Sequence, residues 1–180
     1  MNTVPYIFCD AVATLLEDLD HAQEFVKSAS TKPGKWKAAL NDHVTNRRKI
    51  FLQIGLTTKY SYSFVDETVT GFHWFADVQQ IAPKFLKMSG IAVFPSSVHR
   101  PCAVEEFDRV IRFIAPFMIG SRLEFYKYIE ASDDHFSHIL APLERIPLRA
   151  VLGRDNGCVE EFASKQMKLG YWHECLSTIL

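Results

Sequence analysis

The amino-acid sequence predicts an α+β fold, in which an N-terminal helical segment precedes short antiparallel strands and then irregular, leucine-rich-repeat-like βα units with parallel strands. The apolar spacing changes from a period of 3.6 residues to a period of 2 at about residue 50. Downstream, short apolar segments ending in Ala-Pro recur at 81–83, 114–116 and 140–142, each followed about ten residues later by a β-like run. A recurrence of this length is typical of stacked repeats.

The helical segment begins with an expected helix over residues 4–19. Its apolar side chains fall on one face at helical spacing, and Pro5 suits a first turn. That face comprises Val4, Ile7, Phe8, Ala11, Val12, Leu15, Leu16 and Leu19. We expect a short helix over 21–29 and a third over 35–48 that carries Trp36. The predicted organisation is therefore a helical region, 1–48, followed by a β and then βα region, 49–180.

Strands are expected from residue 50, where apolar and other residues alternate. This pattern predicts two or three antiparallel strands with a hairpin at Asp66-Glu67. From residue 77 helices and strands alternate, and helical crossovers between strands give parallel pairing. Each Ala-Pro proline ends a helix because it lacks an N–H. Phe107, Phe136 and Phe162 occupy equivalent first-turn positions and are expected to pack onto the sheet.

The C-terminal part has one near match to a leucine-rich repeat. Residues 143–148 fit Leu-x-x-Ile-x-Leu, but Val151 stands where the repeat has Asn or Cys. The alternative is an ordinary βα open sheet in which the short sequence similarities between segments are coincidental.

Composition limits the classes of function. The net charge of −1 provides no general field for nucleic acid or for an anionic membrane. The start lacks a signal-peptide pattern, no apolar run is long enough to span a membrane, and the four cysteines lack CxxC spacing. We therefore expect reduced thiols and a cytoplasmic or nuclear location. The basic cluster at 47–49 is expected to be a solvated helix end.

Catalytic and metal-binding patterns are weak. The best candidate is Asp133-Asp134-His135-x-x-His138, in which both histidines share a helix face. The same aspartates suit a helix start, which needs no metal. No glycine-rich phosphate loop or GxSxG elbow is present. The sequence predicts a non-catalytic protein with no cofactor and no metal; a small α/β enzyme or metal-binding protein is an alternative.

The opening of the chain and Trp36 carry a resemblance to a known family. The sequence Val-Pro-Tyr-Ile-Phe-Cys-Asp over 4–10 is similar to the start of an F-box, with Val4-Pro5 at its usual Leu-Pro. Phe8, Val12 and Leu15 stand at its apolar positions, and Trp36 at its tryptophan. The whole chain resembles the nematode-expanded family of F-box and F-box-associated proteins, although 21–30 lacks the leucine-rich second helix of a strong F-box.

This resemblance implies a substrate-recognition adaptor of an SCF-type, cullin–RING ubiquitin ligase. Residues 1–48 would then dock a Skp-type linker, and the rest of the chain would present an unknown protein target. The docking residues would be Val4, Pro5, Ile7, Phe8, Val12 and Leu15, a helix-in-groove mode. The alternative is a stand-alone interaction or structural domain whose first helix is buried in its own core.

Overall fold

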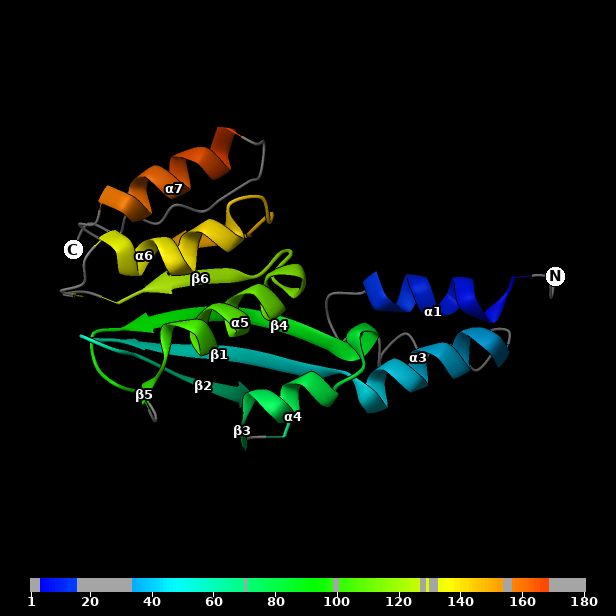
Figure 1. Ribbon diagram of the computed structural model, residues 1–180. Coiled ribbons are helices and arrows are strands. Elements are labelled where there is room, and N and C mark those ends of the chain that lie inside the picture. The colour runs from blue at the N-terminus through cyan, green and yellow to red at the C-terminus, as the bar shows by residue number, and fades with distance from the viewer. Residues whose placement is uncertain are drawn as a thin grey trace. The chain divides into compact units, whose positions relative to one another are not determined.

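The protein has an α+β fold, as the sequence predicts (Figure 1). The computed structural model describes residues 4–15, 34–69, 71–98, 101–126, 129, 133–153 and 157–168. The helix expected over 21–29 lies outside these residues. The chain forms two compact units. The helical unit combines Met1–Arg48 with Ile81–Leu86, and the sheet unit combines Lys49–Gln80 with Lys87–Leu180.

The described part of the helical unit contains two helices and a short 3₁₀ turn. Helix α1 spans Tyr6–Leu15, α3 spans Gly34–Asn46, and the 3₁₀ helix η2 spans Pro83–Phe85. Ala13 of α1 and Leu40 of α3 form its buried apolar cluster, against which Val44 packs. A cluster this small leaves most of the surface of α1 outside the core.

The sheet unit is built on a mixed sheet. Its main path runs β3-β2-β1-β4-β6-β7, and β5 pairs with β2 outside that path. Strands β1 and β2 are antiparallel, whereas β4, β6 and β7 pair in parallel. The bounds are β1 Arg48–Leu56, β2 Tyr60–Asp66, β3 Gly71–His73, β4 Leu86–Phe94, β5 Pro101–Cys102, β6 Arg122–Phe125 and β7 Ala150–Leu152. The predicted hairpin at Asp66-Glu67 is confirmed, because the chain turns between β2 and β3 there.

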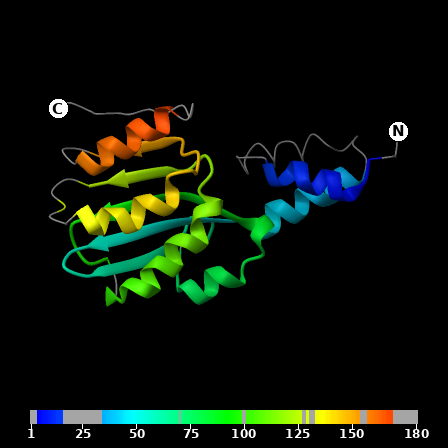
Figure 2. The same cartoon turned by 45° about the horizontal axis from the view of Figure 1, so that its top comes forward.

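The described α-helices of the sheet unit lie over one face of the sheet (Figure 2). They are α4 Phe75–Gln80, α5 Val104–Ile114, α6 Asp133–Leu140 and α7 Gly157–Lys168. Phe107 of α5 stacks on Tyr60 of β2 at 4.2 Å between ring centroids, and Phe136 of α6 lies 5.7 Å from Phe125 of β6. These contacts confirm the predicted packing of Phe107 and Phe136 onto the sheet, and Phe162 is buried as well.

The three Ala-Pro segments share one structural role. Each contributes to a 3₁₀ helix: η2, then η3 at Ala115–Phe117 and η4 at Ala141–Leu143. The next strand along the chain is β4, β6 and β7 respectively. Proline cannot supply the N–H that continues an α-helix, so the last turn tightens before the chain becomes extended. The sequence repeat is therefore a helix–3₁₀–strand unit.

Gly55 of β1 lies where a loop crosses the sheet. The backbone N–H of Val98 donates a hydrogen bond to Ser61 Oγ at 3.2 Å. A Cβ atom at Gly55 would collide with Ser61 Oγ and with backbone atoms of Ser96 and Val98. The absence of a side chain at this position allows the loop to approach.

Candidate interaction surface

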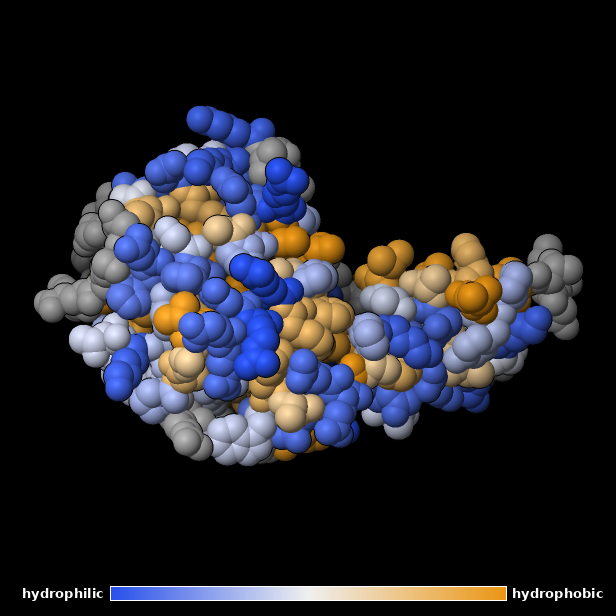
Figure 3. All heavy atoms as spheres, viewed as in Figure 1, coloured by the Kyte–Doolittle hydropathy of each residue, from blue (hydrophilic) through white to orange (hydrophobic). Residues whose placement is uncertain are grey.

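Helix α1 buries its small side chains and exposes its large ones. Cys9 and Ala13 are completely buried, whereas Ile7, Phe8 and Leu15 are 75%, 53% and 78% exposed. Small residues at this i, i+4 spacing face α3, so the two helices approach closely. The large apolar side chains are consequently left facing outward, and Figure 3 shows apolar atoms along the upper edge of this unit.

The predicted docking residues therefore share a surface. Val4, Pro5, Ile7, Phe8 and Leu15 are exposed, and Val12 is half-buried. We call Val4, Ile7, Phe8 and Leu15 the α1 apolar face. Residues 16–19, also assigned to the predicted helix, lie outside the described residues.

Trp36 extends this surface onto α3. Its ring is half-buried and meets Phe8 edge to face, with ring centroids 6.1 Å apart and planes at 87°. Aromatic pairs favour this T-shaped arrangement. The apolar surface thus spans both helices.

A buried polar network connects α1 to α3. His43 of α3 is 1% exposed; its Nδ1 lies 3.2 Å from Arg47 Nη2, and its Nε2 lies 3.1 Å from Asp10 Oδ1. Arginine only donates hydrogen bonds, so Nδ1 must accept and Nε2 must carry the proton that His43 donates to Asp10. The geometry defines a neutral imidazole with one tautomer.

The electrostatic surroundings keep His43 neutral. Burial lowers the pKa of His43 below its ordinary value, and the Arg47 cation lowers it further, while Asp10 opposes the shift. Partial burial would raise the pKa of Asp10, but hydrogen bonds from Lys84 and His43 outweigh that effect and lower it. Asp10 is therefore a carboxylate beside an uncharged histidine.

Arg47 donates hydrogen bonds to the backbone of α1. Its Nη2 donates to the carbonyl oxygens of Ala13 at 2.6 Å and Thr14 at 3.4 Å. Both carbonyls belong to the last described turn of α1, and carbonyl oxygens on the C-terminal side of a helix carry partial negative charge. The expectation that 47–49 is a solvated helix end is wrong for Arg47, which is 3% exposed. Its guanidinium is buried because it donates hydrogen bonds to carbonyl oxygens of α1.

Lys84 of η2 joins the same network from a distant part of the chain. Its Nζ lies 3.2 Å from Asp10 Oδ1 and 3.3 Å from Asp42 Oδ2. Hydrogen bonds to both carboxylates raise the pKa of Lys84. The Phe85 ring packs on His43 at 5.1 Å. The sequence offered no signal that residues 81–86 would complete this unit.

The sheet unit contains a shallow pocket of about 400 Å³, in which Tyr60 and Cys102 are poorly activated. Tyr60, Cys102 and His135 contribute to its lining. Burial raises the pKa of Cys102 to about 11 and that of Tyr60 to about 12, so both groups are protonated at neutral pH. A thiol in this state is a poor nucleophile.

The two histidines of the predicted metal site both pack against Tyr60, with ring centroids 5.2 Å (His135) and 5.9 Å (His138) from that of the tyrosine. His138 Nδ1 also lies 2.8 Å from Asp108 Oδ1. Within the described part of the chain, no group of three or more His, Cys, Asp or Glu residues could hold a metal ion. The side chain of Asp133 lies outside that description. No helix in the described ranges has the length and apolar character needed to cross a membrane.

Comparisons with known proteins identify no relative. No family model matches the chain, and neither the curated proteins nor the solved structures contain a significant match. The functional argument therefore depends on the surface of the molecule itself.

Proposed function

We propose that this chain is a non-catalytic protein–protein interaction protein that docks a partner through the α1 apolar face. The observation that carries the proposal is the exposure of Ile7, Phe8 and Leu15 on a helix whose small residues are buried. Burying one large apolar side chain stabilises an association by roughly 1.5–3 kcal/mol. A contiguous apolar surface of this kind is typical of interaction sites.

The spacing of these side chains favours a groove as the complementary surface. Ile7, Phe8 and Leu15 follow the helical spacing of anchors that enter a hydrophobic groove. Phe8 already rests against Trp36, which restricts its ring before a partner arrives. A restricted side chain loses less conformational entropy on binding.

The finer proposal is that the partner is the Skp-type linker of an SCF-type, cullin–RING ubiquitin ligase. The F-box-like opening, with Val4-Pro5 and the later Trp36, supports this choice. The sheet unit would then present an unknown protein target, and the complex would act in the cytoplasm or nucleus. No nucleic acid, membrane, metal or cofactor enters this proposal.

Binding of purified Skp-type linker to the full chain tests the proposal. The Ile7→Asp/Leu15→Asp variant should retain the wild-type thermal melt and lose linker binding, because both side chains are largely exposed. Ile119→Asp is the matched control: Ile119 is 60% exposed but lies in the sheet unit, so binding should be unchanged.

Two outcomes would contradict the proposal. Equal linker binding by wild type and the double variant would exclude the α1 apolar face as the docking site. Loss of the cooperative melt in the double variant would instead favour the stand-alone alternative, in which α1 belongs to the chain's own core.

A further inference from the structure

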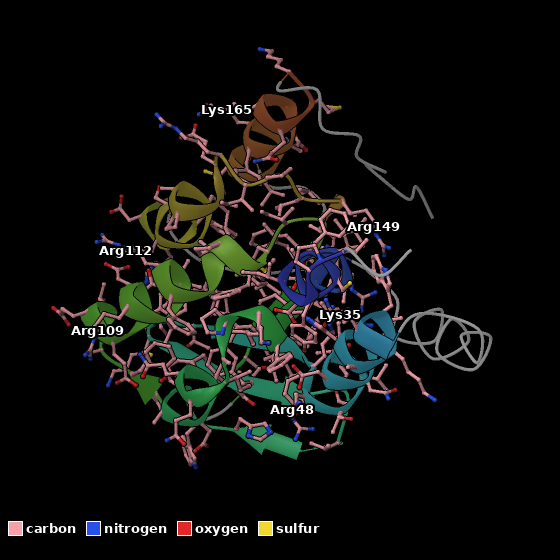
Figure 4. The ribbon with its side chains drawn as sticks, turned by 90° about the vertical axis from the view of Figure 1, so that its right-hand side faces the viewer. Lys35, Arg48, Arg109, Arg112, Arg149 and Lys165 are labelled. Carbon is pink, nitrogen blue, oxygen red and sulfur yellow. The ribbon has the colours of Figure 1, made fainter. Side chains whose placement is uncertain are left out.

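The α1 apolar face borders a pair of exposed cations. Lys35 and Lys37 precede and follow Trp36 in α3, and both are exposed. Successive helical residues are about 100° apart, so the two ammonium groups flank the tryptophan on opposite sides. Figure 4 labels Lys35 at the end of the helical unit where α1 and α3 begin.

These cations occupy an unfavourable position for folding. They lie in the first two turns of α3, whose first turn contains no acidic residue. The N-terminal end of a helix carries partial positive charge, so lysine there is destabilising and a carboxylate would be favourable. A residue that destabilises the element in which it lies is typical of a functional surface.

The described part of the helical unit supplies no carboxylate to these cations. Its two aspartates, Asp10 and Asp42, are both bound to Lys84. Neither Lys35 nor Lys37 forms an ion pair among the described residues. Positive charge is therefore available beside the apolar face.

We propose that the partner is an acidic protein surface, with apolar side chains that contact Ile7, Phe8 and Trp36 and carboxylates at the rim that face Lys35 and Lys37. This inference depends on the proposed use of the α1 apolar face for docking, and adds the charge of the partner. Charge complementarity at a rim sets specificity and association rate.

The same observations favour a protein over a lipid surface. Helices that lie on anionic membranes carry several lysines or arginines on their polar face. The described helix α1 contains neither residue type, and its one charged residue is Asp10. A second copy of this chain has a net charge of only −1, so it carries little surplus negative charge to attract the two lysines.

A matched pair of fluorescein-labelled helical peptides provides the test. Both peptides carry leucines along one face; in one the flanking positions are glutamates, and in the other lysines. The full-length wild-type chain should bind the glutamate peptide about tenfold more tightly, since two exposed ion pairs contribute modestly. This preference should shrink at high salt and disappear in Lys35→Glu/Lys37→Glu.

The charge-reversed variant controls for folding. Glutamates at the start of α3 complement the helix dipole, so its melting temperature should equal or exceed that of wild type. A loss of preference for the glutamate peptide then reports the surface and not the fold.

The outcomes separate the two proposals. Equal binding of both peptides, abolished by Ile7→Asp/Leu15→Asp, would retain the docking surface and overturn the acidic partner. Failure of both peptides to bind would count against the docking surface itself. Binding to phosphatidylserine vesicles, or dimerisation, that requires Ile7 and Leu15 would replace the acidic protein with a membrane or a second copy.

Discussion

Replacing Arg47 with methionine should detach α1 from α3 more effectively than any surface change in the helical unit. Methionine retains much of the apolar length of the side chain but removes every donor. The buried carbonyl oxygen of Ala13 and Nδ1 of His43 would both lose their hydrogen bonds from Arg47.

The expected cost follows from these two contacts. Hydrogen bonds from a charged donor contribute about 1.5–3 kcal/mol each, and a buried group left without a partner adds a desolvation penalty. Arg47 is 3% exposed and His43 is 1% exposed, so water cannot replace the lost donors. We expect Arg47→Met to destabilise the α1–α3 packing by about 3 kcal/mol.

Hydrogen exchange of the α1 amides in the full chain measures this local opening. A loss of about 3 kcal/mol corresponds to exchange that is faster by on the order of 100-fold. Lys84→Met is the matched control: it removes another cation of the network, but its side chain is 40% exposed, so the effect should be small. If the two variants accelerate exchange equally, burial does not determine the contribution of Arg47 and the reasoning is refuted.

Two further predictions concern acid and backbone packing. The pKa of folded His43 lies below its ordinary value of 6.5, so on acidification the unfolded chain takes up a proton that the folded chain excludes. Thermal stability should therefore decline below about pH 6.5. His43→Gln, which retains a donor and an acceptor, should make this decline less steep. If the melting temperature of the variant falls with pH as that of wild type does, His43 is not the source of the decline. In the sheet unit, Gly55→Ala should lower the free energy of unfolding by about 1–3 kcal/mol through overpacking. Gly157→Ala is the control and should have no such effect, because no atom lies within 4 Å of its new Cβ. Urea denaturation measures both variants, and equal effects would contradict the steric argument.

Much of the fold follows from local patterns. Alternating apolar residues placed β1 and β2, because a period of 2 positions one set of side chains against the core. The Ala-Pro segments located helix ends, because proline cannot continue the backbone hydrogen bonding. In both cases the determining interaction lies within a few residues of the pattern.

The candidate surface was only partly accessible from sequence. Helical spacing placed Ile7, Phe8 and Leu15 on one apolar face, but spacing cannot say whether a large apolar face or a small one meets the neighbouring helix. The choice depends on α3, where Leu40 forms a buried cluster with Ala13 of α1. The sequence predicts an exposed Arg47, because the carbonyl groups to which it donates belong to a helix far away in the sequence.

The inclusion of 81–86 in the helical unit has a consequence for the order of assembly. Synthesis proceeds from the N-terminus, so α1 and α3 are made before Lys84 and Phe85. The residues of β1, β2 and β3 are made in the interval. Until residue 86 emerges, Asp10 and Asp42 face one another without their shared cation. An excised fragment that ends at residue 48 would remain in this incomplete state, so the docking surface should be studied in the full chain.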